Sequence, residues 1–563
     1  DVSPSASTLS IEAVDTAEDG SCQALLIDTQ TVQFALECLS PGSCGAATAS
    51  ISNTSVTPSD TGSLSYFPVN LDFGSSSSSE ATFNLNYSEA GQIQLHAFYE
   101  LLDQSGAVSG EVISVSSNSF AASPFGFCIE PSSSETNWQC STPGVSANCS
   151  AYKQAGDTFD LDIIAKAWNN SGGSDYCDSG FIQTQNFNLA LSISHALVAP
   201  LGGDTGTFSA SSLSLSSGQN LASAQSFSEL AVFTLDAGGD DYFGVTLPIS
   251  SSENIGRFYA KDFLVTSTSA ATFDDANTGF SYVGQLNGSD GAITYTLVPS
   301  FNFQVRGFNN QALKNYIGDY AHAVDITVGA SSSIMGATSV LNVTAGFTTG
   351  VISGPDASAE YTYTFDVSDH FVFDREDNSL IDEFNNDIQL DITDFSESVD
   401  SVSLASGTFN IGGSGGVVRY GRLHINAAFG AETSAVSQTW KMEYYDGSDF
   451  IFNSLDSDTA YDLSQIGSIT VTDVGDNSDP LLSTDSSASG EIADIGVFAS
   501  GLLQVNWAAT TGGRYGTIRF PYNIDSWLEY DWSGSGDEDP EASVTFGQYR
   551  GHDRVIYWKE INY

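Results

Sequence analysis

The side chains most often used in catalysis are scattered along this 563-residue chain. None of its histidines has the spacing of a zinc-binding His-Glu-x-x-His motif. Residues 412–416 fit the Gly-x-Ser-x-Gly pattern of serine hydrolases, with Ser414 as the nucleophile. That motif needs a strand that turns sharply into a helix, and a strand pattern follows here instead. We therefore predict a protein that is not an enzyme and has no catalytic residues. The six histidines are His96, His195, His322, His370, His424 and His552.

Acidic segments are the next candidates for chemistry. Asp and Glu number 69 in total, so carboxylate pairs arise by chance and do not indicate glycoside hydrolysis. The runs 374–387, 473–479 and 537–541 could supply oxygen ligands to calcium. None of them fits the EF-hand loop, and a solvated acidic loop is the alternative interpretation. We expect no cofactor and leave calcium binding open.

The formal net charge of −54 narrows the classes of partner. Binding to nucleic acid or to an anionic membrane surface requires clusters of Lys and Arg, which this chain lacks. A strongly acidic, hydrated surface instead favours solubility in salty water. No apolar run approaches the roughly 20 residues of a membrane helix, so we predict no membrane insertion.

Cysteines form two groups, both in the first third of the chain. Local groups of cysteines in strand-and-loop sequence predict disulfides and an oxidising compartment. For the second group we favour nested pairs, Cys140 with Cys149 and Cys128 with Cys177, among three connectivities. The first group is odd, so one thiol is free, intermolecular, or paired outside the chain. The first group is Cys22, Cys38 and Cys44, and the second is Cys128, Cys140, Cys149 and Cys177.

Aromatic residues near the end of the chain form a candidate binding surface. Trp527, Tyr530 and Trp532 lie close together and are bordered by acidic residues. Exposed aromatic rings stack against sugar faces, so these three could bind a glycan. Packing in a core or at a corner of the fold is the alternative.

Basic residues are scarce and unevenly placed. Only Lys153 and Lys166 precede residue 256, whereas most of the others follow residue 410. Scarce cations in an acidic protein are expected to make defined contacts. They could form a docking face for an acidic subunit, or pair internally with Asp or Glu. The candidate docking cations are Arg419, Arg422, Arg550 and Arg554.

Strands must position these residues, because apolar side chains alternate with polar ones throughout. The segments 83–87, 159–163, 187–193 and 361–367 have this period of two. Clusters of Ser, Gly, Asn and Asp separate them and are typical of turns. We predict an all-β protein of several serial immunoglobulin-like β-sandwich domains. The expected domains are 1–122 and 123–252, each with one cysteine group, then 253–405 and 406–563.

Three blocks of sequence resemble the MshQ-like family, an accessory component of the MSHA (mannose-sensitive haemagglutinin) type IV pilus system. The strongest is GTIRFP at 516–521, SWLEYDW at 526–532 and DPEASVTFGQYRG at 539–551. A second contains VRYGRL at 418–423 and EYYDG at 443–447, and a weaker third begins with GRF at 256–258. The resemblance is strongest over 406–563 and weaker over 255–405. It implies a role in pilus assembly, capping or adhesion.

The leading functional hypothesis is therefore a non-enzymatic, extracellular protein associated with the MSHA pilus. Its partners would be pilins or pilus-assembly proteins. One alternative is a subunit of a surface fibre or layer that polymerises through β-strand contacts. The odd cysteine and the strand-like residues 555–563 would suit such contacts between copies. A second alternative is a carbohydrate-binding adhesin module with a glycan receptor.

Overall fold

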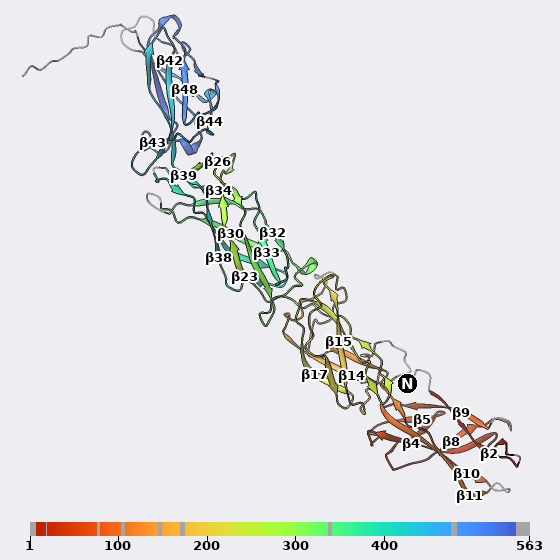
Figure 1. Cartoon of the computed structure of the whole chain (residues 1–563). Coiled ribbons are helices and arrows are strands. Elements are labelled where there is room, and N and C mark those ends of the chain that lie inside the picture. The colour runs from red at the N-terminus through yellow and green to blue at the C-terminus, as the bar shows by residue number, and fades with distance from the viewer. Residues whose placement is uncertain are drawn as a thin grey trace, which may run out of the picture.

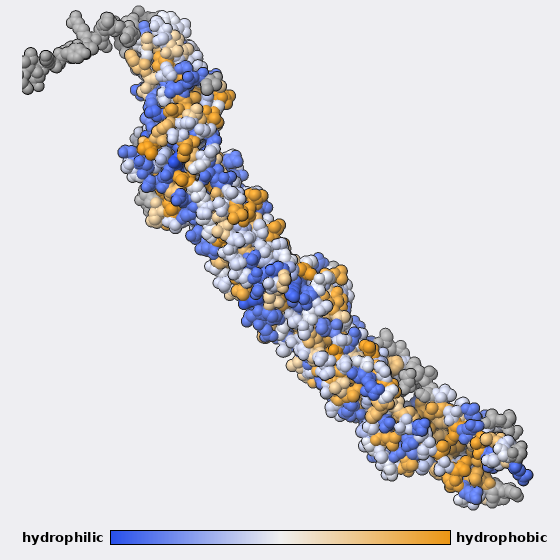
Figure 2. All heavy atoms as spheres, in the orientation of Figure 1, coloured by the Kyte–Doolittle hydropathy of each residue, from blue (hydrophilic) through white to orange (hydrophobic). Residues whose placement is uncertain are grey.

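In a computed structural model, the chain forms four β-sandwich domains that follow one another in an elongated row (Figure 1). Polar and hydrophobic residues are interspersed over most of the visible face (Figure 2). Within the described residues, no helix is both long and apolar enough to cross a membrane. The structure describes residues 7–18, 20–75, 79–102, 107–144, 149–168, 175–335, 340–377, 379–473, 481–491 and 493–547.

The first domain packs two antiparallel sheets face to face, with a short hairpin beside them. One sheet has the order β1 (Ser7–Glu12), β9 (Glu80–Tyr87), β5 (Ala49–Ile51) and β6 (Thr54–Val56). The other contains β11 (Val108–Ser116), β10 (Gly91–Leu102), β4 (Thr29–Ser40) and β7 (Ser59–Asp60), with β8 (Phe67–Asp72) and β12 (Phe120–Ala122) at its margins. The hairpin is β2 (Val14–Thr16) with β3 (Cys22–Ala24).

The second domain is built in the same way from shorter strands. Its first sheet is β13 (Gly126–Pro131), β14 (Thr158–Lys166) and β17 (Gln219–Ser226). Its second is β16 (Ser212–Leu215), β15 (Leu189–Ala199), β18 (Val232–Ala237), β21 (Ser250–Ser251) and β22 (Ile255–Gly256). A hairpin joins β19 (Asp241–Tyr242) to β20 (Val245–Thr246).

The third domain has two main sheets and several small ones. The first main sheet is β23 (Asp262–Ser269), β29 (Ser300–Arg306), β33 (Glu360–Thr364) and β32 (Val351–Ser353). The second is β28 (Tyr295–Leu297), β24 (Ala271–Phe273), β38 (Phe409–Ser414), β36 (Gln389–Glu397) and β30 (Asp325–Ser331), with β37 (Val402–Ser403) paired to β36. The small sheets are β25 (Phe280–Tyr282) with β39 (Val417–Arg419) and β35 (Phe384–Asn385), β26 (Leu286–Asn287) with β27 (Asp290–Gly291), and β31 (Val343–Gly346) with β34 (His370–Phe373). One 3-10 turn is η2 (Gly318–Tyr320).

The fourth domain closes the row with two more packed sheets. One is β40 (Gly421–Ile425), β42 (Val436–Tyr445), β48 (Leu502–Trp507) and β46 (Ala488–Gly490), with β43 (Phe450–Phe452). The other is β41 (Ala428–Ala431), β50 (Glu541–Gly547), β49 (Gly516–Pro521) and β45 (Thr470–Asp473). A small pair is β44 (Ala460–Asp462) with β47 (Ile495–Val497), and 3-10 turns are η3 (Leu463–Gln465), η4 (Thr511–Gly513) and η5 (Ser526–Leu528).

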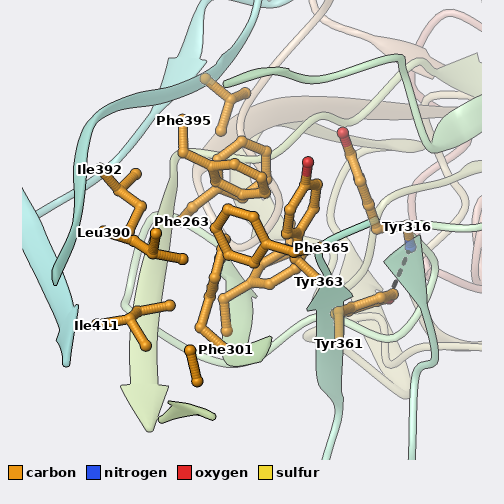
Figure 3. Packing of buried hydrophobic residues seen from close by; sticks show 14 of the residues in the cluster. Phe263, Phe301, Tyr316, Tyr361, Tyr363, Phe365, Leu390, Ile392, Phe395 and Ile411 are labelled. Atoms are coloured by element: carbon orange, nitrogen blue, oxygen red, sulfur yellow. Dashed lines mark hydrogen bonds between the residues drawn. The ribbon is translucent and has the colours of Figure 1, made fainter. Parts of the chain in front are cut away.

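Alternating sequence becomes alternating burial, which confirms the predicted all-β class. In β14, Phe159, Leu161 and Ile163 are buried, while the side chains between them are partly exposed. The third domain shows the result of such alternation on facing sheets. Its core packs aromatic rings edge to face, and the ring centroids of Phe301 and Phe395 are 5.2 Å apart (Figure 3).

The third domain extends further along the chain than the expected boundary at 405. Strand β38 pairs with β36, and β39 pairs with β25 and β35. Both strands follow residue 405, yet they complete sheets that begin before it. The third domain therefore ends near Arg419, because without β38 and β39 the strands on either side of them would have open edges.

Three disulfides lie in the first two domains: Cys38–Cys44, Cys128–Cys177 and Cys140–Cys149. The second cysteine group is thus joined in the nested arrangement. Cys22 is a free, exposed thiol in β3. Disulfides of this kind are typical of proteins outside the reducing cytosol.

We expect the Cys128–Cys177 bond to stabilise its domain more than Cys38–Cys44 stabilises the first. The two bonds span sequence separations of 49 and 6 residues. The loop-closure relation gives losses of about 4 and about 2 kcal/mol when each pair is replaced by alanine. Urea unfolding of the two double-alanine variants, Cys128→Ala/Cys177→Ala and Cys38→Ala/Cys44→Ala, measures the difference. Equal losses would contradict the expectation.

Candidate functional site

Each junction between neighbouring domains is held by buried polar side chains. At the second junction, the Arg257 guanidinium binds both carboxylate oxygens of Asp400, and each side chain is only 3% exposed. Arg257 Nε also donates to the Cys149 carbonyl oxygen at 3.2 Å. A buried charge without its partner is strongly destabilising. The ion pair is therefore satisfied only while the second and third domains stay in contact.

The backbone before Arg257 needs glycine. Gly256 has a φ of +139°, and a Cβ there would lie 2.6 Å from the Ala231 carbonyl oxygen. Only glycine allows so close an approach at such a φ. Phe258 N donates to the same carbonyl at 2.9 Å, which fixes the chain on both sides of Arg257.

The group around Asp400 contains three residue types that bind metals, but their side-chain atoms already have partners in the protein. His322 Nδ1 lies 3.2 Å from a Glu397 oxygen and 3.6 Å from an Asp400 oxygen. Arg257 pairs with Asp400, and Glu397 accepts backbone N–H groups of the turn that follows it. These contacts identify a structural cluster rather than a cation site.

A second polar cluster at this junction surrounds Asn315, which is fully buried. Its side chain accepts from Asp204 N at 2.6 Å and donates to the carbonyl oxygens of Asp204 and Leu230 at 2.9 and 3.0 Å. The Glu229 carboxylate accepts from Lys314 N at 3.1 Å and Asn315 N at 3.3 Å. Burial raises the pKa of Glu229 to about 7, although these backbone hydrogen bonds oppose the shift.

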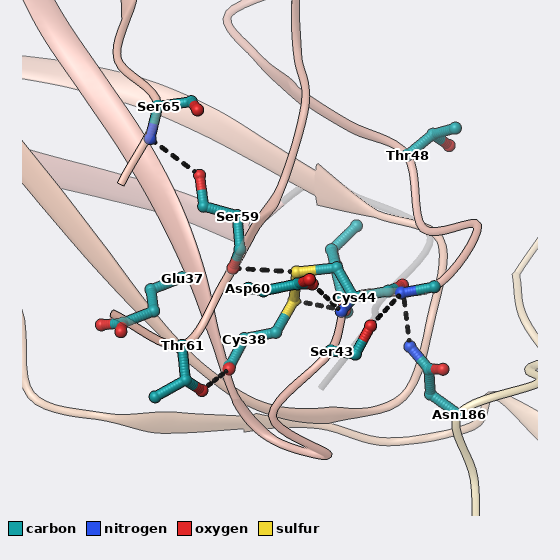
Figure 4. The surroundings of a disulfide bond; sticks show 12 residues. Glu37, Cys38, Ser43, Cys44, Thr48, Ser59, Asp60, Thr61, Ser65 and Asn186 are labelled. Atoms are coloured by element: carbon teal, nitrogen blue, oxygen red, sulfur yellow. Dashed lines mark hydrogen bonds between the residues drawn. A yellow bond between two sulfur atoms is a disulfide. The ribbon is translucent and has the colours of Figure 1, made fainter. Parts of the chain in front are cut away.

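The junction between the first and second domains is also held by buried polar contacts. Glu89 belongs to the first domain and is 6% exposed, and its carboxylate accepts from Gln185 N and Asn186 N of the second at 3.1 and 3.0 Å. Asn186 Nδ2 donates back to the Cys44 carbonyl oxygen at 3.1 Å, beside the Cys38–Cys44 disulfide (Figure 4). The disulfide loop is thereby tied to the next domain.

Arg375 connects the third domain to the fourth. Its guanidinium stacks on the Tyr420 ring, 3.7 Å from the centroid, and pairs with Asp537 at 3.0 Å. It also donates to three backbone carbonyls of the fourth domain: Gly421 O in β40, Trp527 O in η5 at 3.0 Å, and Glu529 O just after η5. The acidic runs 374–387 and 537–541 therefore meet through an arginine.

On the same junction, Tyr282 of the third domain enters the core of the fourth. Its hydroxyl donates to Asp456 Oδ2 at 2.7 Å and accepts from Asn453 Nδ2 at 2.7 Å. Arg419 donates to Asn453 Oδ1 at 2.8 Å and to Glu383 at 2.7 Å. The structure thus places Arg419 inside the molecule, where it serves internal pairing and not a docking face.

Arg422, the second described candidate for docking, is also paired internally. Its guanidinium lies 3.7 Å from the Phe450 ring centroid, 4.8 Å from that of Tyr530 and 4.7 Å from that of Trp532. It also donates to Glu443 at 2.7 Å. Guanidinium stacking between rings is favourable where water is partly excluded. Arg422 is therefore the centre of an aromatic cluster and not an exposed cation.

The predicted glycan surface is only partly assembled. The rings of Tyr530 and Trp532 lie 5.1 Å apart, and Trp532 is 38% exposed. Trp527 instead packs partly buried against the fourth-domain core.

Burial would raise the pKa of Glu443, but hydrogen bonds from His424 and Arg422 outweigh it and lower this pKa.

The other sequence candidates stay apart from one another. Ser414 lies in β38 and not at a turn into a helix, which removes the nucleophile geometry. The five described histidines contact different parts of the chain, and His552, Arg550 and Arg554 lie outside the described residues. Asp473 ends β45, and the rest of the run 473–479 is also outside them. Sequence reasoning assigned no role to Arg257, Arg375 or Asn315, although Arg257 lies in the GRF block and Arg375 in the acidic run 374–387.

Four domain models of one family match consecutive parts of the chain. They are DUF6701, first Ig-like domain, at 1–116; second domain, at 123–226; third domain, at 229–419; and fourth domain, at 419–561. No curated protein matches the chain.

Solved structures of other Ig-domain proteins are similar at low scores. The FdeC adhesin of Escherichia coli is 9% identical, with 74% of this chain and 96% of that chain covered and a TM-score of 0.24. The adhesin InvE of Yersinia pseudotuberculosis is 13% identical over 50% of this chain and 60% of that one, at 0.17. A structure of titin Ig domains is 7% identical over 70% and 94%, also at 0.17.

Replacing one partner of the buried Arg257–Asp400 ion pair should lower the free energy of unfolding more than replacing both partners. We expect Arg257→Met and Asp400→Leu each to lower the free energy of unfolding by about 3–5 kcal/mol, and the double variant to lose less. Lys314→Met removes the exposed pair with Asp204, whose side chains are 45% and 41% exposed, and should cost under about 1 kcal/mol. Urea unfolding measures all four; additive losses in the double variant would contradict a coupled pair.

The raised pKa of Glu229 predicts a pH dependence with a definite sign. Between its ordinary pKa of 4.5 and about 7, the folded state holds a proton that the unfolded state has lost. Stability from this group is therefore present at low pH and lost as pH rises through that window, by up to about 3 kcal/mol. Urea unfolding at pH 5 and pH 8 should show a smaller fall for Glu229→Gln than for the parent. The exposed control Glu253→Gln should follow the parent.

Proposed function

Because this chain carries the four DUF6701 domains in order and so belongs to that family, we propose that it is a rigid, non-enzymatic surface protein associated with the MSHA pilus. The observation that carries the proposal is the buried polar contact at every domain junction. Flexible linkers would let neighbouring domains rotate, whereas Arg257, Glu89 and Arg375 lose their partners if they do. Four sandwiches joined in this way form a stiff spacer.

A stiff spacer suits a role in pilus assembly, capping or adhesion. It holds its terminal domain at a fixed distance from the structure to which the other end is attached. The three disulfides and the net charge of −54 support an extracellular location. We propose pilins or pilus-assembly proteins as partners. Arg419 and Arg422 are engaged internally, so these two cations do not form the docking face.

Glycan binding is a second candidate, favoured by one observation. Trp532 is 38% exposed beside Tyr530, so part of an aromatic face is open to a ligand. Arg422 contacts the same rings and would share them with a sugar. Weakened binding to a polysaccharide column by Trp532→Ala, with unchanged folding, would support this role.

We expect an antibody against residues 406–563 to label the tips or bases of surface filaments on intact cells. Such labelling follows if the protein is an accessory component beside the pilus. Immunogold electron microscopy measures it, and cells that lack the main pilin are the control. Regular labelling along the whole pilus filament would mean that this chain is a subunit of that filament, and the proposal of an accessory role beside the pilus would be wrong.

A further inference from the structure

In the part of the chain that the structure describes, the first domain has an open sheet edge. Strand β11 is nine residues long and, among the described strands, pairs with β10 alone. Edge strands are usually protected by lysine, proline or shortness, because their free N–H and C=O groups can pair with another chain. The sequence of β11, VSGEVISVS, has one charge and neither lysine nor proline. This edge is therefore long and open to pairing.

The inward-facing side of β11 is also uncovered. Val115 lies opposite Ala97, a core residue that is 5% exposed, yet Val115 itself is 54% exposed. Cross-strand partners share one face of a sheet, so Val115 points toward the sandwich interior without a cover. Val112, on the other face of the strand, is equally exposed at 54%. Apolar side chains on both faces of this strand are therefore exposed.

A cavity of about 230 Å³ opens where that cover is missing. It lies between the two sheets, with Ile11 of β1 on one side, Ile113 and Val115 of β11 on the other, and Phe73 at its floor. Strand β1 is an edge of the facing sheet, so the cavity separates two strand edges. Hydrophobic residues gather on this domain at the free end of the row (Figure 2), and β11 lies at the opposite end from β42 and β48 (Figure 1).

We propose that the β11 edge and its cavity bind residues 548–563 of a second copy of this chain as an added strand. This segment has the sequence QYRGHDRVIYWKEINY, which is rich in apolar and aromatic residues. Val555, Tyr557, Lys559 and Ile561 share one parity, so an added strand would turn three apolar or aromatic side chains and one long amphipathic one to the cavity side. Main-chain hydrogen bonds to β11 would supply affinity, and these side chains would supply specificity.

Charge favours residues 548–563 over the rest of the chain as the segment that binds the first domain. Residues 1–122 contain 14 Asp and Glu residues and no Lys or Arg. Residues 548–563 contain three Lys and Arg (Arg550, Arg554 and Lys559) against two acids (Asp553 and Glu560), a net charge of +1 in a chain of −54. A strand with this balance is attracted to the acidic first domain, whereas the chain as a whole is repelled.

Length and position allow the contact between copies. The segment has 16 residues after Gly547, or about 50 Å when extended, and β11 requires about 30 Å of partner strand. Gly547 belongs to the fourth domain and β11 to the first, at opposite ends of the row (Figure 1). Docking of one end on the other is therefore heterologous and extends the row copy by copy.

Complementation between two blocked chains tests the proposal. Val115→Asp places a charge at the mouth of the cavity, and Tyr557→Asp places one on the added strand. Each full-length variant alone should remain monomeric in sedimentation velocity at concentrations where the parent assembles. An equimolar mixture should form dimers and nothing longer, since one chain retains an intact edge and the other an intact segment. Val351→Asp changes an equally suitable exposed valine, 66% exposed in the edge strand β32, and should assemble like the parent.

The outcomes separate pairing between copies from pairing within one chain. Each blocked variant should raise the apparent dissociation constant about tenfold or more, with unchanged circular dichroism and melting temperature. A monomeric parent at all concentrations, variants that assemble like the parent, or a mixture that fails to dimerise would overturn the proposal. The fourth-domain family model extends to residue 561, so pairing of the segment within its own domain is the specific rival that a failed mixture would indicate. Sedimentation of the purified protein tests this contact between copies independently of the proposed association with the pilus.

Discussion

A charge buried between two domains is stable only while both domains supply its partners, and this constraint holds the row together. Arg257 has its carboxylate partner in the third domain, and Arg375 has carbonyl and carboxylate partners in the fourth. Such pairs add little net stability, because desolvation of the charges offsets their attraction. Separation of the domains is nevertheless costly, since each charge would lose its partner. The ion pairs therefore fix orientation more than they raise stability.

The scarcity of cations follows from the same arrangement. Only 15 Lys and Arg residues balance 69 acids, so the surface repels itself at every point along the row. Arg257, Arg375 and Arg419 lie in or beside domain junctions, and Arg257 and Arg375 each neutralise a buried acid that burial would otherwise penalise. Arg422 likewise neutralises Glu443 within the fourth domain. An acidic surface can thus coexist with tightly docked domains, because the repulsion is confined to side chains that water solvates.

The sequence predicted what local patterns determine and missed what long-range contacts determine. Alternation of Phe159, Leu161 and Ile163 specified a strand with one buried face, because the period of two is a property of the backbone. Arg257 and Asp400 lie 143 residues apart, and no spacing rule connects them. For the same reason, only part of the aromatic cluster around Arg422 was predicted from the sequence. Tyr530 and Trp532 are neighbours in sequence, whereas Phe450 reaches Arg422 only through the fold.

Position in the row explains why the exposed apolar edge occurs in the first domain. Each inner domain contacts a neighbour at both ends, and core residues cross those junctions: Ala90 packs into the second domain and Tyr282 into the fourth. The first domain has one such neighbour, through Glu89 and Cys44. Its far end keeps the cavity between β1 and β11, with Val115 uncovered. A further strand would complete this edge by main-chain pairing, a contact that differs from the buried polar contacts joining the domains within the chain.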